Sequence, residues 1–98
     1  MIIVIGDMND KNYERAKAHL IDTEKKHQIY GTADIVTLPE IAELLPLDER
    51  QFADLMLHIL SYVNIIYCLK SWETDNDARM YHDYCAHNGY KIIYSKKF

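Results

Sequence analysis

Two short segments that lie far apart in the chain combine carboxylates with other residues that can contact a ligand. The first, 6–10, reads Gly-Asp-Met-Asn-Asp, and the second, 70–77, reads Lys-Ser-Trp-Glu-Thr-Asp-Asn-Asp. Carboxylates beside an aromatic ring suit a neutral ligand with many hydroxyl and amide donors, such as a nucleoside, because an ionised carboxylate only accepts hydrogen bonds. They repel a bare polyphosphate unless a basic side chain or Mg²⁺ intervenes. The candidate ligand-binding residues in these segments are Gly6, Asp7, Met8, Ser71, Trp72, Asp75 and Asp77.

Each acidic segment follows an apolar run that is typical of a buried parallel strand. Residues 2–5 are Ile-Ile-Val-Ile, and the second run covers 63–69. Ligands of open α/β sheets bind beyond the carboxyl ends of the strands, at the point where the strand order reverses. We therefore expect the two segments to meet in one crevice. Asp54 joins them if the start of its helix packs against the same rim.

Strands and helices alternate along the rest of the chain. Strands are expected at 2–5, 33–38, 63–69 and 90–94. Two helices are expected to begin at a capping residue: the first runs from a cap at Asn9 or Asp10 to about His27, and another from a cap at Asp48 to about Ser61. Two further helices are expected at 39–45 and 76–87. The buried face of the first helix is expected to carry Tyr13, Ala16, Leu20 and Thr23. This alternation calls for parallel strands joined by right-handed crossovers. The prediction is one domain over 1–98, an α/β fold with a small flavodoxin-like sheet of four parallel strands in the order 2-1-3-4 and helices on both faces.

Composition narrows the classes of partner. The 98 residues are 49% hydrophobic and 27% charged, and 11 basic against 15 acidic residues give a net charge of -4, which does not favour a nucleic-acid backbone. Cys68 and Cys85 show no CxxC spacing, so we expect reduced packing residues in a cytoplasmic protein. The apolar stretch 55–69 is too short and too polar to cross a membrane. Because the first strand begins at Met1 without a basic segment before it, we expect no signal peptide. We expect no nucleic acid and no membrane as partners.

Several familiar site motifs are missing from the sequence. It contains no GxGxxG, Walker, HExxH or GxSxG pattern, so we expect no nucleotide cofactor, no metal and no serine nucleophile. Structural roles are equally open for the candidate residues. Asp75 can simply cap the last helix, and Trp72 can cover the end of the core or a dimer contact as readily as it can stack on a base.

Three short motifs resemble the DUF4406 family, small proteins that are frequently encoded by phages or prophages and are similar to nucleoside 2-deoxyribosyltransferases. The motifs are a G-P-M-like turn after the first strand, here Gly6-Asp7-Met8, an Asp-Leu pair on a helix, here Asp54-Leu55, and a segment of the form W-x-x-S-x-G-A-x-x-E, here Trp72 to Tyr81. The resemblance spans nearly the whole chain, and it implies the transferase-like fold and a nucleoside or nucleotide as ligand.

The resemblance also implies a chemistry that this chain is poorly equipped to perform. In the transferases a glutamate on the last helix attacks the anomeric carbon of the deoxyribose, and a neighbouring carboxylic acid helps to protonate the departing base. Asp54 matches the aspartate near base and sugar, and Asp75 falls close to the loop aspartate. The glutamate position, however, is Tyr81, the family glycine is Asp77, and the usual strand aspartate is Asn64. A phenol with a pKa of about 10 is a poor nucleophile, although Asp77 lies one turn earlier on the same helix face and can replace the carboxylate.

The leading functional hypothesis is therefore a cytoplasmic, homo-oligomeric protein that binds a nucleoside or nucleotide and has weak or no catalytic activity. One alternative is an active N-glycosidase or 2-deoxyribosyltransferase, with Asp77, Tyr81 and Asp54 as the catalytic residues. The others are a phage-encoded binder of a nucleotide signal and a pure interaction protein.

Overall fold

Four parallel strands form the centre of the molecule. The computed structural model describes residues 1–31, 34–44, 46–63 and 65–98. The strands are β1 (Ile2–Ile5), β2 (Ile35–Thr37), β3 (Ile65–Cys68) and β4 (Lys91–Tyr94), and they pair in the order β2-β1-β3-β4. Ile3 faces Val36 on one side and Ile66 on the other. The predicted order and parallel pairing are confirmed.

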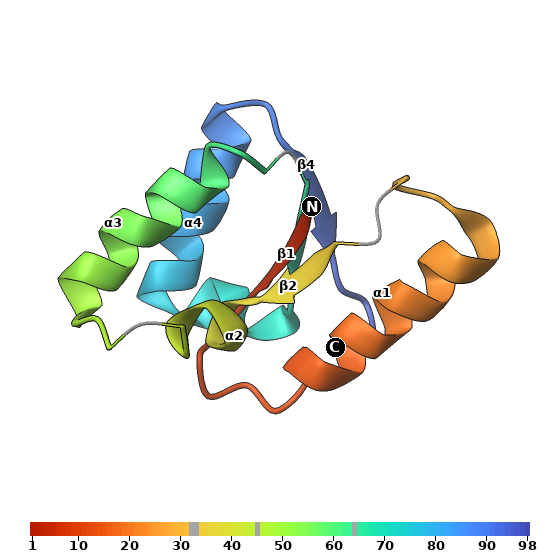
Figure 1. Ribbon diagram of the computed structural model, residues 1–98, viewed down its shortest axis with the longest axis horizontal. Coiled ribbons are helices and arrows are strands. Elements are labelled where there is room, and N and C mark those ends of the chain that lie inside the picture. Colours follow the sequence, from red (N-terminus) through yellow and green to blue (C-terminus); the bar gives the residue numbers. More distant parts are fainter. Residues whose placement is uncertain (32–33, 45, 64) are drawn as a thin grey trace.

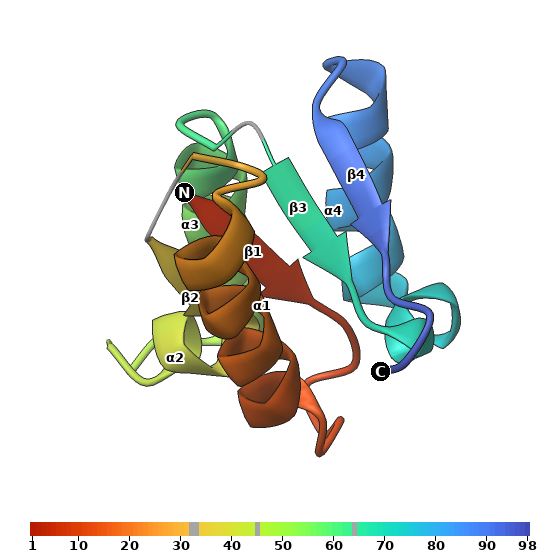
Figure 2. The same cartoon turned by 90° about the vertical axis from the view of Figure 1, so that its right-hand side faces the viewer.

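Helices cover both faces of this sheet, as predicted. Figures 1 and 2 show α1 (Tyr13–His27) on one face, and α3 (Glu49–Leu60) and α4 (Asn76–His87) on the other. The short α2 (Leu38–Ala42) lies beside the carboxyl end of β2. All four residues of β1 have no exposed surface, because β1 has a strand on each side and helices on both faces.

The helix boundaries follow local capping chemistry. At Asp48 the side chain accepts from the Gln51 backbone N–H at 2.8 Å, while the Gln51 side chain accepts from the Asp48 N–H, so the predicted capping box is confirmed. Thr37 and Glu40 form a second capping box, which starts α2 directly after β2.

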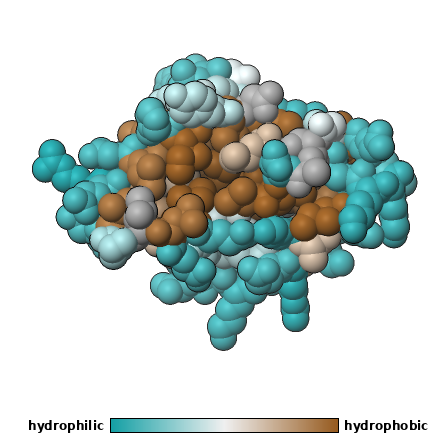
Figure 3. Space-filling model, in the orientation of Figure 1, coloured by the Kyte–Doolittle hydropathy of each residue, from teal (hydrophilic) through white to brown (hydrophobic). Residues whose placement is uncertain are grey.

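Hydrophobic residues remain visible over α3 and the edge strand β2 in Figure 3.

Three details differ from the sequence expectations. The cap of α1 is Asn12 rather than Asn9 or Asp10, because 6–12 forms turns of its own before the helix begins. Glu24, not Thr23, completes the buried face of that helix. The expected loop after β3 is a 3-10 helix, η1 (Lys70–Thr74). The expected strand residue 33 and the family position Asn64 lie outside the described residues.

Along the described ranges, every helix is too short or too polar to traverse a lipid bilayer.

Candidate functional site

The two acidic segments meet beyond β1 and β3, where a direct hydrogen-bond network joins them. The Ser71 hydroxyl donates to an Asp10 carboxylate oxygen at 2.5 Å and accepts from the Asp7 backbone N–H at 3.0 Å. Gly6 makes this junction possible, since a Cβ there would lie 2.8 Å from Ser71 Oγ and 3.0 Å from Leu69 Cβ. The point between β1 and β3 where the strand order reverses is therefore filled by the protein's own side chains.

Three of the candidate carboxylates hold the backbone in place. Asp7 accepts from the Asn9 N–H at 2.9 Å, and Asp10 accepts from the Asn12 N–H at 2.9 Å. Asp75 caps α4 by accepting from the Ala78 N–H at 2.9 Å. These contacts shape the carboxyl edge of the sheet and use oxygens that would otherwise be available to a ligand.

A pocket beside this junction contains two of the three candidate catalytic residues. We call it the Tyr81 pocket. It has a volume of about 230 Å³ and lies between the loop after β1, α2 and the N-terminal turns of α3 and α4. Its lining residues are Met8, Leu38, Ala42, Leu47, Asp48, Glu49, Phe52, Asp77 and Tyr81.

The Tyr81 hydroxyl is the unusual group of this pocket. The side chain is 1% exposed, and its oxygen has no hydrogen-bond partner among the described residues. Burial, followed by the charges of Asp77 and Asp75, raises the pKa of Tyr81 to about 12. The group is therefore a neutral phenol at physiological pH, and it can donate a hydrogen bond that nothing within the described chain accepts.

Carboxylates form the rim around this phenol. Asp77 is exposed in the first turn of α4, and Asp48 and Glu49 are exposed at the start of α3. Because Asp48 uses one oxygen as a helix cap, Asp77 and Glu49 are the freer acceptors. The rim suits hydroxyl and amino donors, and the Phe52 ring supplies an apolar wall.

Asp54 does not join the predicted crevice. It is exposed on α3 and lines neither of the two pockets described for this edge of the molecule. The helix buries Met56 and Leu60 against the sheet, and a residue two positions before Met56 points about 200° away around the helix. Asp54 therefore lies outside the Tyr81 pocket, and its predicted ligand-binding and catalytic roles gain no support from this placement.

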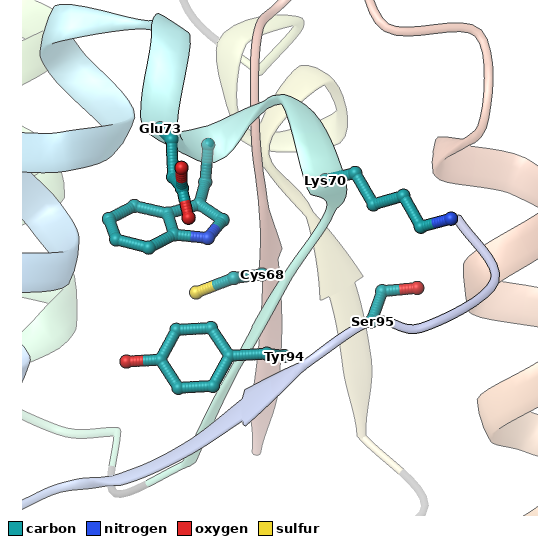
Figure 4. A pocket seen from close by; sticks show the side chains of 6 residues that line it. Cys68, Lys70, Glu73, Tyr94 and Ser95 are labelled. Atoms are coloured by element: carbon teal, nitrogen blue, oxygen red, sulfur yellow. The ribbon is translucent and has the colours of Figure 1, made fainter.

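Trp72 is also separated from the Tyr81 pocket. It lines a second cavity of about 440 Å³, which we call the Trp72 pocket and which Figure 4 shows. Its lining residues are Cys68, Lys70, Trp72, Glu73, Tyr94 and Ser95, at the carboxyl ends of β3 and β4. The single crevice expected from the sequence is thus two pockets.

His82 is a functional candidate that the sequence pattern did not single out. Its ring stacks on the Trp72 indole with centroids 3.9 Å apart, and its two nitrogens contact Asp83 at 2.9 Å and the Tyr94 hydroxyl at 2.7 Å. The sequence held only an indirect indication: His82 lies one helical turn beyond Ala78, near the helix face that packs against the rest of the protein.

Among the described residues, no group of histidine, cysteine, aspartate and glutamate side chains has the arrangement of a metal site. Comparison with family models, with curated proteins and with solved structures finds no match to this chain.

The buried weak acids predict loss of stability at alkaline pH. Burial raises the pKa of the Cys68 and Cys85 thiols from an ordinary 9.0 to about 12, as it raises that of Tyr81 from 10.0. The folded state therefore holds these protons more tightly than the unfolded state, so their contribution to stability is complete below pH 9.0 and is lost as the pH rises towards about 12. Thermal unfolding measured across this range should show a melting temperature that falls steadily. Tyr81→Phe should reduce the fall above pH 10.0, and a melting temperature that is flat up to pH 11 would contradict the assignment.

Proposed function

We propose that this protein binds a nucleoside or nucleotide in the Tyr81 pocket and has little or no catalytic activity there. The observation that carries the proposal is the buried Tyr81 hydroxyl, which lacks a partner among the described residues and belongs to a side chain that lines a pocket rimmed by carboxylates. A buried polar group without a partner costs free energy, and a ligand that accepts its hydrogen bond removes that cost.

The pocket chemistry supports a ligand with many donors. Asp77 and Glu49 can accept from sugar hydroxyls or base amino groups, while Tyr81 donates to a ring nitrogen, a carbonyl or a sugar oxygen. The volume of about 230 Å³ is below the range of about 300–1,000 Å³ that is common for small-molecule sites. Only the base or the sugar is therefore enclosed, and a phosphate would project into solvent, away from the carboxylate rim.

The resemblance supports the same pocket and argues against efficient chemistry. Tyr81 stands where the related transferases carry their glutamate, and Met8 comes from the motif after the first strand. An active N-glycosidase or deoxyribosyltransferase remains the second candidate because Asp77, a carboxylate, lines the same pocket. Asp77 is exposed, however, whereas a carboxylate nucleophile works best where water is excluded.

The proposal includes the cytoplasmic, homo-oligomeric state expected from the sequence. Apolar surface over α3 and β2 supports self-association, since α3 exposes parts of Phe52, Leu55 and Ile59 (Figure 3). A binder of a nucleotide signal would use the same pocket. A pure interaction protein would instead use this apolar surface.

A thermal-shift screen of nucleosides, mono- and dinucleotides and cyclic nucleotides tests the proposal. A ligand at about a hundred times its dissociation constant adds roughly 2.7 kcal/mol of stability, which raises the melting temperature of a domain of this size by several degrees or more. Tyr81→Phe should abolish most of that shift. It should leave the stability of the free protein unchanged or slightly higher, because it removes a buried hydroxyl that has no partner within the described chain.

Asp54→Asn is the matched control, since Asp54 is exposed and lies outside both pockets. It should keep the full ligand shift. The proposal fails if no compound stabilises the protein, or if Tyr81→Phe and Asp54→Asn retain the same shift. In either case the interaction-protein hypothesis takes its place.

A further inference from the structure

The Trp72 pocket has an aromatic wall whose orientation is fixed from behind. The His82 ring stacks on Trp72, with centroids 3.9 Å apart, and bonds the Tyr94 hydroxyl at 2.7 Å. Asp83 contacts the other nitrogen of His82 at 2.9 Å, which orients the imidazole. Asp83 thus orients His82, and His82 in turn holds both the Trp72 and the Tyr94 rings. The aromatic wall is therefore preorganised before any ligand binds.

This wall is a surface and not a slot for a flat ring. The Trp72 and Tyr94 centroids are 5.7 Å apart and the rings are tilted by 40°. A third ring inserted between two others needs about 7 Å, because each contact takes about 3.5 Å. One face of the indole is also covered by His82. A base therefore cannot be sandwiched here, but a compact cationic group can lie against both rings at once.

The pocket also holds two opposite charges that the protein does not pair. Among the described residues, neither the Lys70 ammonium nor the Glu73 carboxylate makes an ion pair or a side-chain hydrogen bond. Figure 4 shows Glu73 at one end of the pocket and Lys70 extending at the other end, on the side of Ser95. The Ser95 oxygen accepts from the Phe98 N–H at 2.7 Å, so its hydroxyl hydrogen is available for donation.

We propose that the Trp72 pocket binds a small zwitterion, with its ammonium group against Trp72 and Tyr94 beside Glu73 and its carboxylate or phosphate group at Lys70 and Ser95. The cavity of about 440 Å³ is large enough for a molecule the size of an amino acid or of phosphocholine. Aromatic rings attract ammonium groups through their negative faces, and Glu73 adds a formal charge at the same end. This site is independent of the Tyr81 pocket and of the function proposed for it.

Trp72 reports directly on this site because it is the single tryptophan of the chain. Titration of the protein with glycine betaine and with phosphocholine, followed by tryptophan fluorescence and by isothermal titration calorimetry, should give saturable binding. Choline alone and inorganic phosphate alone should bind at least about tenfold more weakly, because each satisfies one end only. The two zwitterions distinguish a carboxylate from a phosphate at the Lys70 end.

Glu73→Gln and Lys70→Gln should each weaken zwitterion binding by about two- to fivefold, the size of a single charge interaction at an exposed site. Lys96→Gln, which removes an exposed lysine outside the pocket lining, and Tyr81→Phe should leave binding unchanged. The proposal is overturned if calorimetry detects no zwitterion binding. It is also overturned if Lys96→Gln weakens binding as much as Lys70→Gln, or if a nucleoside monophosphate binds this pocket more tightly than either zwitterion.

Discussion

Incubation of the protein with 2′-deoxynucleosides should release little or no free base. The proposed resemblance to nucleoside 2-deoxyribosyltransferases puts Tyr81 at the position of their nucleophile, and burial raises the pKa of Tyr81 to about 12. At pH 7 only about one phenol in 10⁵ is then ionised. A neutral phenol attacks an anomeric carbon poorly, so the barrier that a carboxylate nucleophile would lower stays high here. Chromatography of the reaction mixture for free base measures this directly.

Two variants distinguish the ways in which this prediction can fail. If base release is rapid and Asp77→Ala abolishes it, the carboxylate one turn earlier on α4 is the nucleophile and the protein is an enzyme. If release is rapid and Tyr81→Phe abolishes it, the phenol reacts in spite of its raised pKa. Asp54→Asn serves as the control that should change nothing, since Asp54 lies outside the Tyr81 pocket.

The fold was predictable because several independent signals agreed. The β-branched run at 2–5 is typical of a strand that is covered on both faces, and the structure gives it the central position. The Asp48–Gln51 spacing predicts the capping box that starts α3. Parallel pairing and right-handed crossovers then leave few arrangements for four strands.

The sequence predicted at which edge of the sheet the candidate residues lie, but not how they are divided between pockets. The sequence places Asp77, Tyr81 and Trp72 near the carboxyl ends of the strands, but it does not show on which side of α4 each side chain falls. That choice depends on the His82 stack, which holds Trp72 on the β4 side, and on Ser71, whose bonds close the space between the loops. The side of α3 on which Asp54 lies is set by Met56 and Leu60, which the helix buries, and this orientation places Asp54 outside the Tyr81 pocket.

Ile3→Ala should cause the largest loss of stability of any variant considered for this protein. Ile3 has no exposed surface and lies in the central strand between Val36 and Ile66. Truncating a fully buried isoleucine to alanine costs about 2–5 kcal/mol, because the cavity collapses only partly. Small domains are stable by about 5–15 kcal/mol, so the melting temperature should fall by more than about 10 °C. Chemical and thermal denaturation measure both quantities.

Ile93→Ala is the matched control, because it removes the same atoms from the partly buried edge strand β4. Its cost should be about half that of Ile3→Ala or less, since part of this side chain already contacts water. Equal costs would mean that β1 is not the centre of the core. Ile3 lines neither pocket, so a nucleoside that stabilises the parent protein should raise the melting temperature of Ile3→Ala by a comparable free energy. A lost ligand shift in this variant would instead show that the Tyr81 pocket depends on the packing of the central strand.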